Sequence, residues 1–375
     1  MSTPRNRPQA DRHTLRDRPR RGQWDRAEGR RHQQGLTLIE LMIAGTLGLL
    51  LLLALVQLFV DNNRHRRQNQ QLASLQDQGR YALAALTRDL QMAGYWGGMF
   101  QAQTIDVRDS ALAGLDGSAD CGPADAEPGW AFDPGARAEF FDDAGGTAVT
   151  TRFSCLTDAR ADTDAVMIRR VSGQASVTPD SCGDIALLAQ DYVLKTNGVV
   201  GSLFRVPASG SMDACTEGEP LSTPLQMYRY LPRLYYIRDW AISAGDGIPT
   251  LCRKTLRRGA SPGWEDECIA EGVEDLQIVW GIDDDGDLMN TPDRYTSQPT
   301  QADMLRAVTA QISLRVRATE PDFSYSDVKT YTYPGREGDR AWTPRQADAE
   351  DDGVAPRHYY RKRFATTVQL KNPLP

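Results

Sequence analysis

The chain has 375 residues, of which 40% are hydrophobic and 25% charged, so it can bury a core and is not a wholly disordered chain. Its net charge of −7 is unevenly divided, because residues 1–35 carry ten arginines against four acids, a net of +6, which leaves −13 for the remainder. An acidic body argues against nucleic acid as the main partner.

The basic segment 1–35 is followed directly by an apolar run, residues 36–60, which holds one formal charge, Glu40. As a helix this run is about 37 Å long, enough to cross a hydrocarbon core of about 30 Å. A secretory signal peptide has a shorter apolar region, and its small-residue cleavage site follows that region. Here the small residue, Gly35, precedes it. We expect a transmembrane helix over 36–60. It follows a leader whose small residue precedes the apolar run, the reverse of the order in a secretory signal peptide.

Glu40 needs an explanation, because an ionised carboxylate inside a bilayer costs at least a few kcal/mol. In a plain anchor it would lie near the interface and reach headgroup water. Alternatively, cleavage after Gly35 would create an α-amino group on Leu36, about one helical turn from Glu40. That cation would pair with Glu40 of the same helix or of a neighbouring subunit, and in low dielectric such a pair sets register.

The stretch "GLTLIE" before a long apolar helix resembles the class III signal of type IV pilins and type II secretion pseudopilins. The resemblance implies that a prepilin peptidase on the cytoplasmic face cuts after Gly35 and N-methylates Leu36. It also implies that Glu40 is the acid that aids assembly. The family usually begins its mature chain with Phe, so Leu36 departs from the pattern.

The orientation signals disagree in part. The leader's +6 favours a cytoplasmic N-terminus, whereas Arg64, Arg66 and Arg67 follow the apolar run closely. The leader has the larger excess, and disulfides need an oxidising compartment. We therefore expect a single-pass inner-membrane protein with a periplasmic C-terminal body.

Residues 61–93 are expected to continue the helix as an amphipathic half, stopping at Gly94 and Gly97–Gly98. Apolar or small residues recur there at helical spacing: Leu72, Leu75, Gly79, Leu83, Leu86 and Leu90. Charged residues fall off this stripe: Asp77, Arg80, Arg88 and Asp89. Gly79 costs about 1 kcal/mol relative to Ala, which suggests a bend or a close contact with a sheet.

Residues 94–375 are expected to form the β-rich body, with a long loop and one short strand over 97–160. Strands are predicted at 165–171, 192–195, 202–206, 233–240, 276–282, 308–318 and 363–370. In "ISLRVRA", residues 312–318, apolar and polar side chains alternate, which predicts a half-buried antiparallel strand. The pattern indicates an α+β, pilin-like fold, with a long N-terminal hydrophobic helix packed on an antiparallel sheet and extended loops.

All six cysteines follow the apolar run, and no C-x-x-C pair occurs, which favours disulfides. Six cysteines allow about fifteen connectivities. Nearest-neighbour pairing is our hypothesis, in which the last pair closes the shortest loop: Cys121–Cys155, Cys182–Cys215 and Cys252–Cys268. The alternative is six buried free thiols.

Further stretches resemble the PilW family of minor pilins: "LQDQGRYALAALTRDLQMAGYWG", "GIDDDGD" with "DRY", "ISLRVRA" and "FATTVQLKN". This resemblance runs in patches from Gly35 to Asn372 and is weakest over 100–230. It implies a subunit that primes type IV pilus assembly at the tip, in a system of twitching motility and cell adhesion. The implied partners are the prepilin peptidase, other minor pilins, the major pilin, a tip adhesin and the inner-membrane assembly platform. The type II secretion analogue is the minor pseudopilin GspJ.

An acidic loop, "GIDDDGDLMNTPDRY", places Asp283, Asp285 and Asp287 at alternate positions, with Asn290 and Asp293 beyond. Hard cations need several oxygens converging on a turn, so the loop is a candidate calcium site. It lacks the glycine and glutamate that an EF-hand loop has at its sixth and twelfth positions. The alternative is a solvated acidic turn at the end of a strand.

No catalytic signature stands out, and we expect no enzyme activity. After the leader only His65 and His358 remain, and there is no G-x-S-x-G, P-loop or H-E-x-x-H pattern. The remaining alternative is a membrane-anchored periplasmic enzyme or adhesin with an uncleaved anchor. The basic run "RHYYRKRF", residues 357–364, is read either as a charged strand face with its aromatic side chains inward or as a contact patch for an acidic neighbouring subunit.

Overall fold

The computed structural model describes residues 35–99, 102–112, 115, 121–123, 129–144, 149–177, 188–210, 226–259, 262–286, 291–333, 340–344 and 356–372. The chain divides into two units, residues 1–62 and 63–375, and each is taken by itself. Leader residues 1–34 lie outside the described part of the first unit. The long helix and the antiparallel sheets of the two units confirm the expected α+β class.

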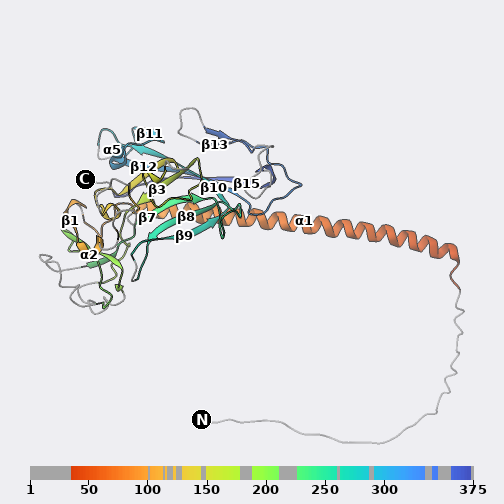
Figure 1. The fold of residues 1–375 in the computed structure, drawn as a ribbon. Helices are drawn as coiled ribbons and strands as arrows, with labels where there is room; N and C mark the ends of the chain where they lie inside the picture. Colours follow the sequence, from red (N-terminus) through yellow and green to blue (C-terminus); the bar gives the residue numbers. More distant parts are fainter. Residues whose placement is uncertain are drawn as a thin grey trace, which may run out of the picture. The chain divides into compact units, whose positions relative to one another are not determined.

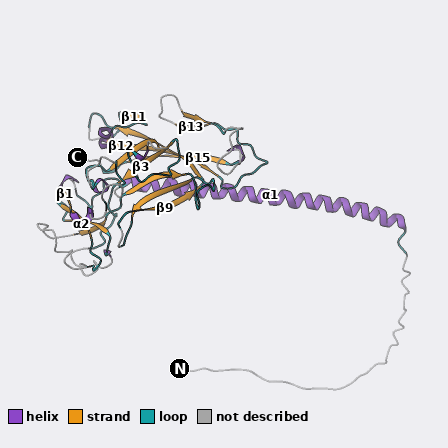
Figure 2. Cartoon of the chain, in the orientation of Figure 1, coloured by secondary structure: helices purple, strands orange, loops and turns teal. Residues whose placement is uncertain are grey.

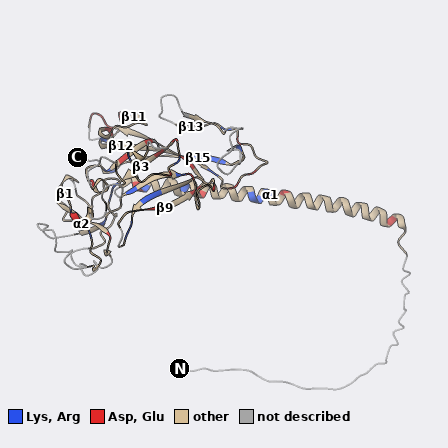
Figure 3. Ribbon diagram, viewed as in Figure 1, with Lys and Arg blue, Asp and Glu red and all other residues tan. Residues whose placement is uncertain are grey.

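The long helix α1, Leu38–Gln91, has 54 residues and ends two residues before the predicted end at residue 93. Within the first unit its side chains are exposed, including large leucine, isoleucine and phenylalanine residues. Figure 3 shows this part of α1 as almost free of charged residues. Among the described helices, α1 is the one that is long and apolar enough to cross a membrane. So much exposed apolar surface requires lipid or other protein to cover it.

The two larger sheets of the second unit are antiparallel (Figures 1 and 2). The large sheet has the order β2-β3-β7-β8-β9, with β2 Ala138–Ala144, β3 Thr163–Ile168, β7 Arg233–Arg238, β8 Thr250–Leu256 and β9 Trp264–Glu271. The C-terminal sheet has the order β11-β10-β12-β15, with β11 Arg294–Thr296, β10 Val273–Ile282, β12 Ala307–Arg317 and β15 Arg361–Gln369. Helix α5, Gln301–Arg306, precedes β12 and is capped by Thr300 and Asp303.

The small sheet has the order β1-β5-β4-β6, in which β1 is parallel to β5. Its strands are β1 Ile105–Val107, β4 Tyr192–Thr196, β5 Gly201–Arg205 and β6 Gln226–Arg229. Short helices lie near it in the chain: η1 Ala102–Thr104, α2 Asp109–Leu112 and η3 Trp130–Phe132. A hairpin of β13, Tyr331–Tyr333, and β14, Arg340–Trp342, precedes η5, Pro356–His358.

One core cluster joins the second half of α1 to both larger sheets. From the helix it contains Leu75, Ala82, Leu86 and Leu90. From the sheets it contains alternate residues such as Tyr235 and Ile237 of β7 and Ile312 and Leu314 of β12. Full burial of each leucine contributes about 1.5–3 kcal/mol, so this face holds the helix in the body. The expected packing of a helix on antiparallel sheet is confirmed.

The seven strands expected from apolar runs are all present within a few residues. Four longer strands were missed: β2, β6, β8 and β9. Strands β8 and β9 carry many charged side chains, "TLCRKTL" and "WEDECIAE", because β9 is an edge strand whose residues are mostly exposed. The expected loop over 97–160 was therefore too long, since it contains β1 and β2.

The prediction that β12 is half-buried was wrong. Its polar residues Ser313, Arg315 and Arg317 are buried as fully as its apolar ones. Arg315 donates to the buried carboxylate of Glu274 and stacks on Trp342, and the guanidinium of Arg317 lies over the ring of Tyr359. Alternation indicated the strand but not what covers its second face.

Gly79 makes the close approach that its place in the helix suggested, and α1 continues through it. A Cβ atom at this position would lie 2.3 Å from Cε2 of Phe364 in β15. Any side chain here would overlap the ring. Glycine thus lets the helix backbone lie against the edge strand of the C-terminal sheet.

Gly79→Ala is expected to destabilise the protein by about 1–2 kcal/mol, because overpacking against Phe364 outweighs the helix-propensity gain of about 1 kcal/mol. Urea unfolding of the full chain in detergent measures the change. In a Phe364→Leu background the same substitution is expected to be neutral or stabilising. A stabilising Gly79→Ala in the parent chain would show that the contact is not close.

Candidate functional site

The start of α1 is held by a reciprocal pair of side chains, Thr37 and Glu40. Thr37 donates to Oε2 of Glu40 through its backbone N, at 3.0 Å, and through Oγ1, at 2.9 Å. The backbone N of Glu40 donates in return to Oγ1 of Thr37, at 3.3 Å. This is a capping box, which satisfies amide groups that have no partner within the helix. Our reading of the sequence missed the role of Thr37, although Thr-x-x-Glu before an apolar run is the signal for it.

The predicted cleavage point lies just outside this cap. Gly35 and Leu36 are exposed and precede the helix, so the peptide bond between them lies in extended or irregular chain. Glu40 is exposed and bound by its own helix start. The proposed cleavage, N-methylation and assembly role of the acid stay predictions.

At the other end of α1, Asp89 is completely buried and bound by three side chains. Oδ1 accepts from Nη2 of Arg170 at 2.6 Å, and Oδ2 accepts from Nη1 of Arg233 at 2.7 Å. The hydroxyl of Tyr235 also donates to Oδ2. The expectation that Asp89 lies off the buried face was wrong, because these donors replace the water that a carboxylate otherwise needs.

Burial by itself would raise the pKa of Asp89, but the charges of Arg233 and Arg170 and the hydrogen bonds outweigh it, and the net pKa is lowered. Asp89 is therefore ionised at neutral pH. The carboxylate links the C-terminal part of α1 to β7 and to the chain just after β3. It fixes how this end of the helix sits on the large sheet.

A second buried carboxylate, Glu274 of β10, gathers arginines from β12 and β15. Arg315 Nε lies 2.9 Å from Oε2, and Arg361 Nη2 lies 2.7 Å from Oε1. Positive charge from Arg361 and Arg315 overcomes the burial of Glu274 and lowers its pKa. The Arg315 guanidinium also stacks 3.7 Å from the ring centroid of Trp342 in β14. This cluster holds the β13–β14 hairpin over the C-terminal sheet.

The basic run 357–364 is thus not a uniformly charged surface. Arg361 and Tyr359 are buried, and only part of the run, such as Lys362, is exposed. The interpretation that aromatic side chains point inward is correct for Tyr359 and Tyr360. Arg361 is bound by Glu274 and therefore cannot belong to a contact patch for an acidic neighbouring subunit.

Two of the three expected disulfides form, Cys121–Cys155 and Cys252–Cys268. Cys252 and Cys268 are opposite one another on β8 and β9, so this bridge ties the edge strand to the large sheet. Cys182 and Cys215 lie outside the described residues. The first bridge joins segments that pack on the outer face of the large sheet, in a cluster with Phe153 and Tyr236.

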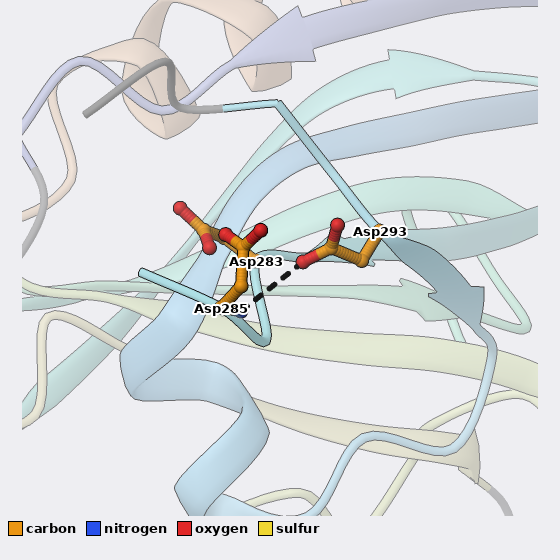
Figure 4. Close-up of side chains that lie close together, drawn as sticks. All are labelled: Asp283, Asp285 and Asp293. Atoms are coloured by element: carbon orange, nitrogen blue, oxygen red, sulfur yellow. Dashed lines mark hydrogen bonds between the residues drawn. The ribbon is translucent and has the colours of Figure 1, made fainter. Parts of the chain in front are cut away.

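The acidic loop brings three of the predicted metal ligands together (Figure 4). Asp283, Asp285 and Asp293 each offer an oxygen, and these atoms lie within 4.8 Å of one another. Two of the carboxylates also accept from the turn itself: Asp283 from the N of Gly286 at 2.7 Å, and Asp293 from the N of Asp284 at 2.7 Å. Asp287 lies outside the described residues. Calcium binding stays a prediction, since these hydrogen bonds also suit a solvated acidic turn.

Comparison with known families gives two matches. Residues 234–372 match the family model PilW, type IV pilus-assembly protein W, which spans β7 to the end of β15. Residues 30–56 match the prokaryotic N-terminal methylation motif, which spans Gly35, Thr37 and Glu40. The stretch "LQDQGRYALAALTRDLQMAGYWG" lies outside both matches. No curated protein and no solved structure matches the chain.

Asp89→Asn is expected to lower the free energy of unfolding by about 3 kcal/mol, because it leaves buried arginines without their counter-charge. Asp77→Asn, on the same helix but exposed, is the matched control and is expected to change stability little. Urea unfolding of the full chain at pH 7 measures both. Equal losses in the two variants would contradict the assigned role of Asp89.

The same residue predicts an acid dependence. The pKa of Asp89 is lowered in the folded protein, so its stabilisation is complete above the unfolded value of about 3.9 and is lost as pH falls through the lower folded value. Below about pH 4, the parent chain should therefore lose more stability than Asp89→Asn does. A parallel pH dependence of the two proteins would rule this out.

Proposed function

We propose that this chain, a type IV pilus-related minor pilin of PilW type, is a non-catalytic structural subunit that is processed after Gly35 and assembled through α1. The observation that carries the proposal is the place of the methylation-motif match. It spans the junction between the exposed Gly35–Leu36 segment and the apolar half of the longest helix. The second match, to pilus-assembly protein W, covers the C-terminal sheet and strands β7, β8 and β9 of the large sheet, which contribute to the core on which the other half of that helix packs.

The apolar half of α1 supports an anchor that later becomes a packing element. Its side chains are exposed in the single chain, and lipid or the apolar helices of other subunits would cover them. The body would remain periplasmic, where its disulfides are stable. In this proposal the inner membrane and its assembly platform hold the subunit until other minor pilins and the major pilin take it into the filament.

Glu40 would change partners during this process. In the single chain its carboxylate accepts from Thr37 at the helix start. Cleavage would add a cationic amino group one residue before Thr37, and a neighbouring subunit would bring a second such group. In low dielectric either pair is strong enough to select one axial register. Position at the pilus tip and priming of assembly with a tip adhesin belong to the same proposal, supported by the match to pilus-assembly protein W.

Two other functions remain as alternatives. A GspJ-type pseudopilin would share the leader, the anchor and Glu40, but the family match is to a pilus-assembly protein. A membrane-anchored enzyme or adhesin would keep its leader. The methylation motif favours cleavage and so disfavours this reading.

Cleavage makes a direct prediction. Mass spectrometry of the protein from envelopes is expected to find a mature N-terminus at N-methyl-Leu36. Gly35→Leu tests the position and is expected to leave the leader attached, because in the proposal the peptidase accepts only a small residue before the cut. An intact leader in the parent protein would overturn the proposal and favour the uncleaved anchor.

Glu40→Ala is expected to leave membrane insertion intact but to reduce incorporation into pili at least tenfold, since the proposed register-setting ion pair is lost. Immunoblotting of sheared pili against envelopes measures the ratio. Gln57→Ala, which removes the polar side chain at the far end of the same apolar run, is the matched control. Normal incorporation of Glu40→Ala would show that the acid does not direct assembly.

A further inference from the structure

The loop between β12 and β13, residues 318–330, displays a large apolar side chain. Phe323 is 72% exposed, and Val328, on the same loop, is 79% exposed. The backbone is held, because the N of Asp322 donates to the carbonyl of His358 at 2.8 Å and the N of Asp327 donates to that of Arg357 at 2.7 Å. Phe323 therefore projects from a fixed loop.

The same loop turns its other aromatic side chain inward. Tyr325 stacks on Tyr360 with ring centroids 4.1 Å apart and packs against the main core. The ring centroids of Phe323 and His358 are 5.5 Å apart, but most of the Phe323 side chain is exposed to solvent. Covering this ring with a second apolar surface would lower the free energy, by about 25 cal/mol per Å² removed from water.

Two hydrogen bonds connect this loop to the part of α1 with which the second unit begins, residues 64–71. Arg64 donates to the hydroxyl of Ser324, the residue next to Phe323. One to two turns further along, Nε2 of Gln71 donates to the carbonyl of Glu320 at 3.4 Å. The loop thus lies beside residues 64–71, and Phe323 is at the end nearer to Arg64.

Chain length limits how far this loop can be from a bilayer. Arg64 follows Val60, the last residue of the apolar run, by four residues. Four residues span about 6 Å as helix and at most about 14 Å as extended chain. Ser324 is bound by the guanidinium of Arg64, so it lies one arginine side chain beyond that backbone span. Because headgroups extend about 5–8 Å beyond the hydrocarbon on each side, Phe323 can reach them.

Charge around the loop favours an anionic surface. Arg64, Arg66 and Arg67 are exposed on α1, and Lys329 is exposed on the loop. Two of the loop's acids are already bound: Asp322 accepts from Tyr360 at 2.8 Å, and the buried Asp327 accepts from Tyr331 at 2.9 Å. Asp322 keeps its negative charge and lies near Arg64, whereas Asp327 is paired with Arg361 at 3.8 Å. With the exposed acids Asp61 and Glu320, three negative charges stand against the four cations, so the excess is one positive charge. An aromatic ring beside arginines is the composition of a membrane-interface contact.

We propose that Phe323, with Arg64, Arg66 and Arg67, forms a contact with the phosphate headgroups of anionic phospholipids on the periplasmic face of the inner membrane. The inference rests on the proposed function, since it requires residues 36–60 in the bilayer. It accounts for the three arginines that follow the anchor on the side where the positive-inside rule does not expect them. The contact would hold the body on the membrane surface until α1 is drawn out.

Photocrosslinking of the full chain, one copy per lipid nanodisc, tests the proposal. The photoreactive residue p-benzoylphenylalanine replaces Phe323 in one protein, Phe59 of the apolar run in a second, and Val199 in a third. Val199 is 71% exposed, on the β4–β5 turn of the small sheet. Lipid adducts are expected at Phe59 and Phe323 and are not expected at Val199, because the small sheet shares its core with Trp96, beyond the far end of α1.

Headgroup recognition is tested with discs of mixed phosphatidylcholine and phosphatidylglycerol. At Phe323, adducts with phosphatidylglycerol are expected to be enriched over its share of the lipid. Arg66→Gln and Arg67→Gln should each lower this enrichment by up to about five-fold, the effect of one basic residue near an anionic surface. Asn62→Gln and Asn63→Gln are neutral controls on the same helix.

The possible outcomes distinguish a failure of the proposed lipid contact from a failure of the proposed membrane anchor. Adducts at Phe59 with none at Phe323 beyond the Val199 background would overturn this inference and leave the anchor in place. Adducts at Phe323 without preference for phosphatidylglycerol would overturn the part played by the arginines. Absence of adducts at Phe59 would overturn the membrane anchor of the proposed function, and this inference with it.

Discussion

The second half of α1 shares one apolar core with two antiparallel sheets, and the rest of the body depends on this burial. Leu75, Ala82, Leu86 and Leu90 supply the helix side of that core. The close approach at Gly79 sets the helix against the edge strand β15. The first half of the same helix is apolar and exposed. One continuous α-helix thus meets two different environments, a protein core and a surface that lipid or other subunits must cover.

Buried ion pairs fix how α1 and the strands are oriented on one another, which apolar packing alone does not do. Asp89 accepts from Arg170, Arg233 and Tyr235, so the end of α1 has one favourable setting on the large sheet. Glu274 does the same for the strands of the C-terminal sheet and its hairpin. Ion pairs of this kind add specificity more than net stability, because desolvation offsets much of the attraction.

Many of the features on which the proposed function rests could be predicted from the sequence, because they depend on the order of residues close together in the chain. The basic segment, Gly35, the capping residues and the apolar helix follow one another along the chain, so recognising them requires no knowledge of tertiary contacts. The extent of α1, expected over 36–93, followed from the apolar run and the helical spacing to within two residues at each end. Strands with apolar runs were also found. Strands β8 and β9 were missed because their charged side chains pair across the sheet, as Lys254 does with Asp266, which no one-dimensional pattern distinguishes from a loop.

By itself, the sequence determined the long apolar helix, the α+β class and the even set of cysteines, since these depend on composition and on residues close together in the chain. Only the tertiary structure decided that Asp89 and Arg361 are buried, that Asp283, Asp285 and Asp293 meet, and that Phe323 projects beside Arg64. The contacts that decide these points join residues as near as Asp285 and Asp293, eight positions apart, and as distant as Arg64 and Ser324, 260 positions apart. Whether a charge faces water or a partner is settled by folding, because the free energy of burying it depends on what the rest of the chain brings to it.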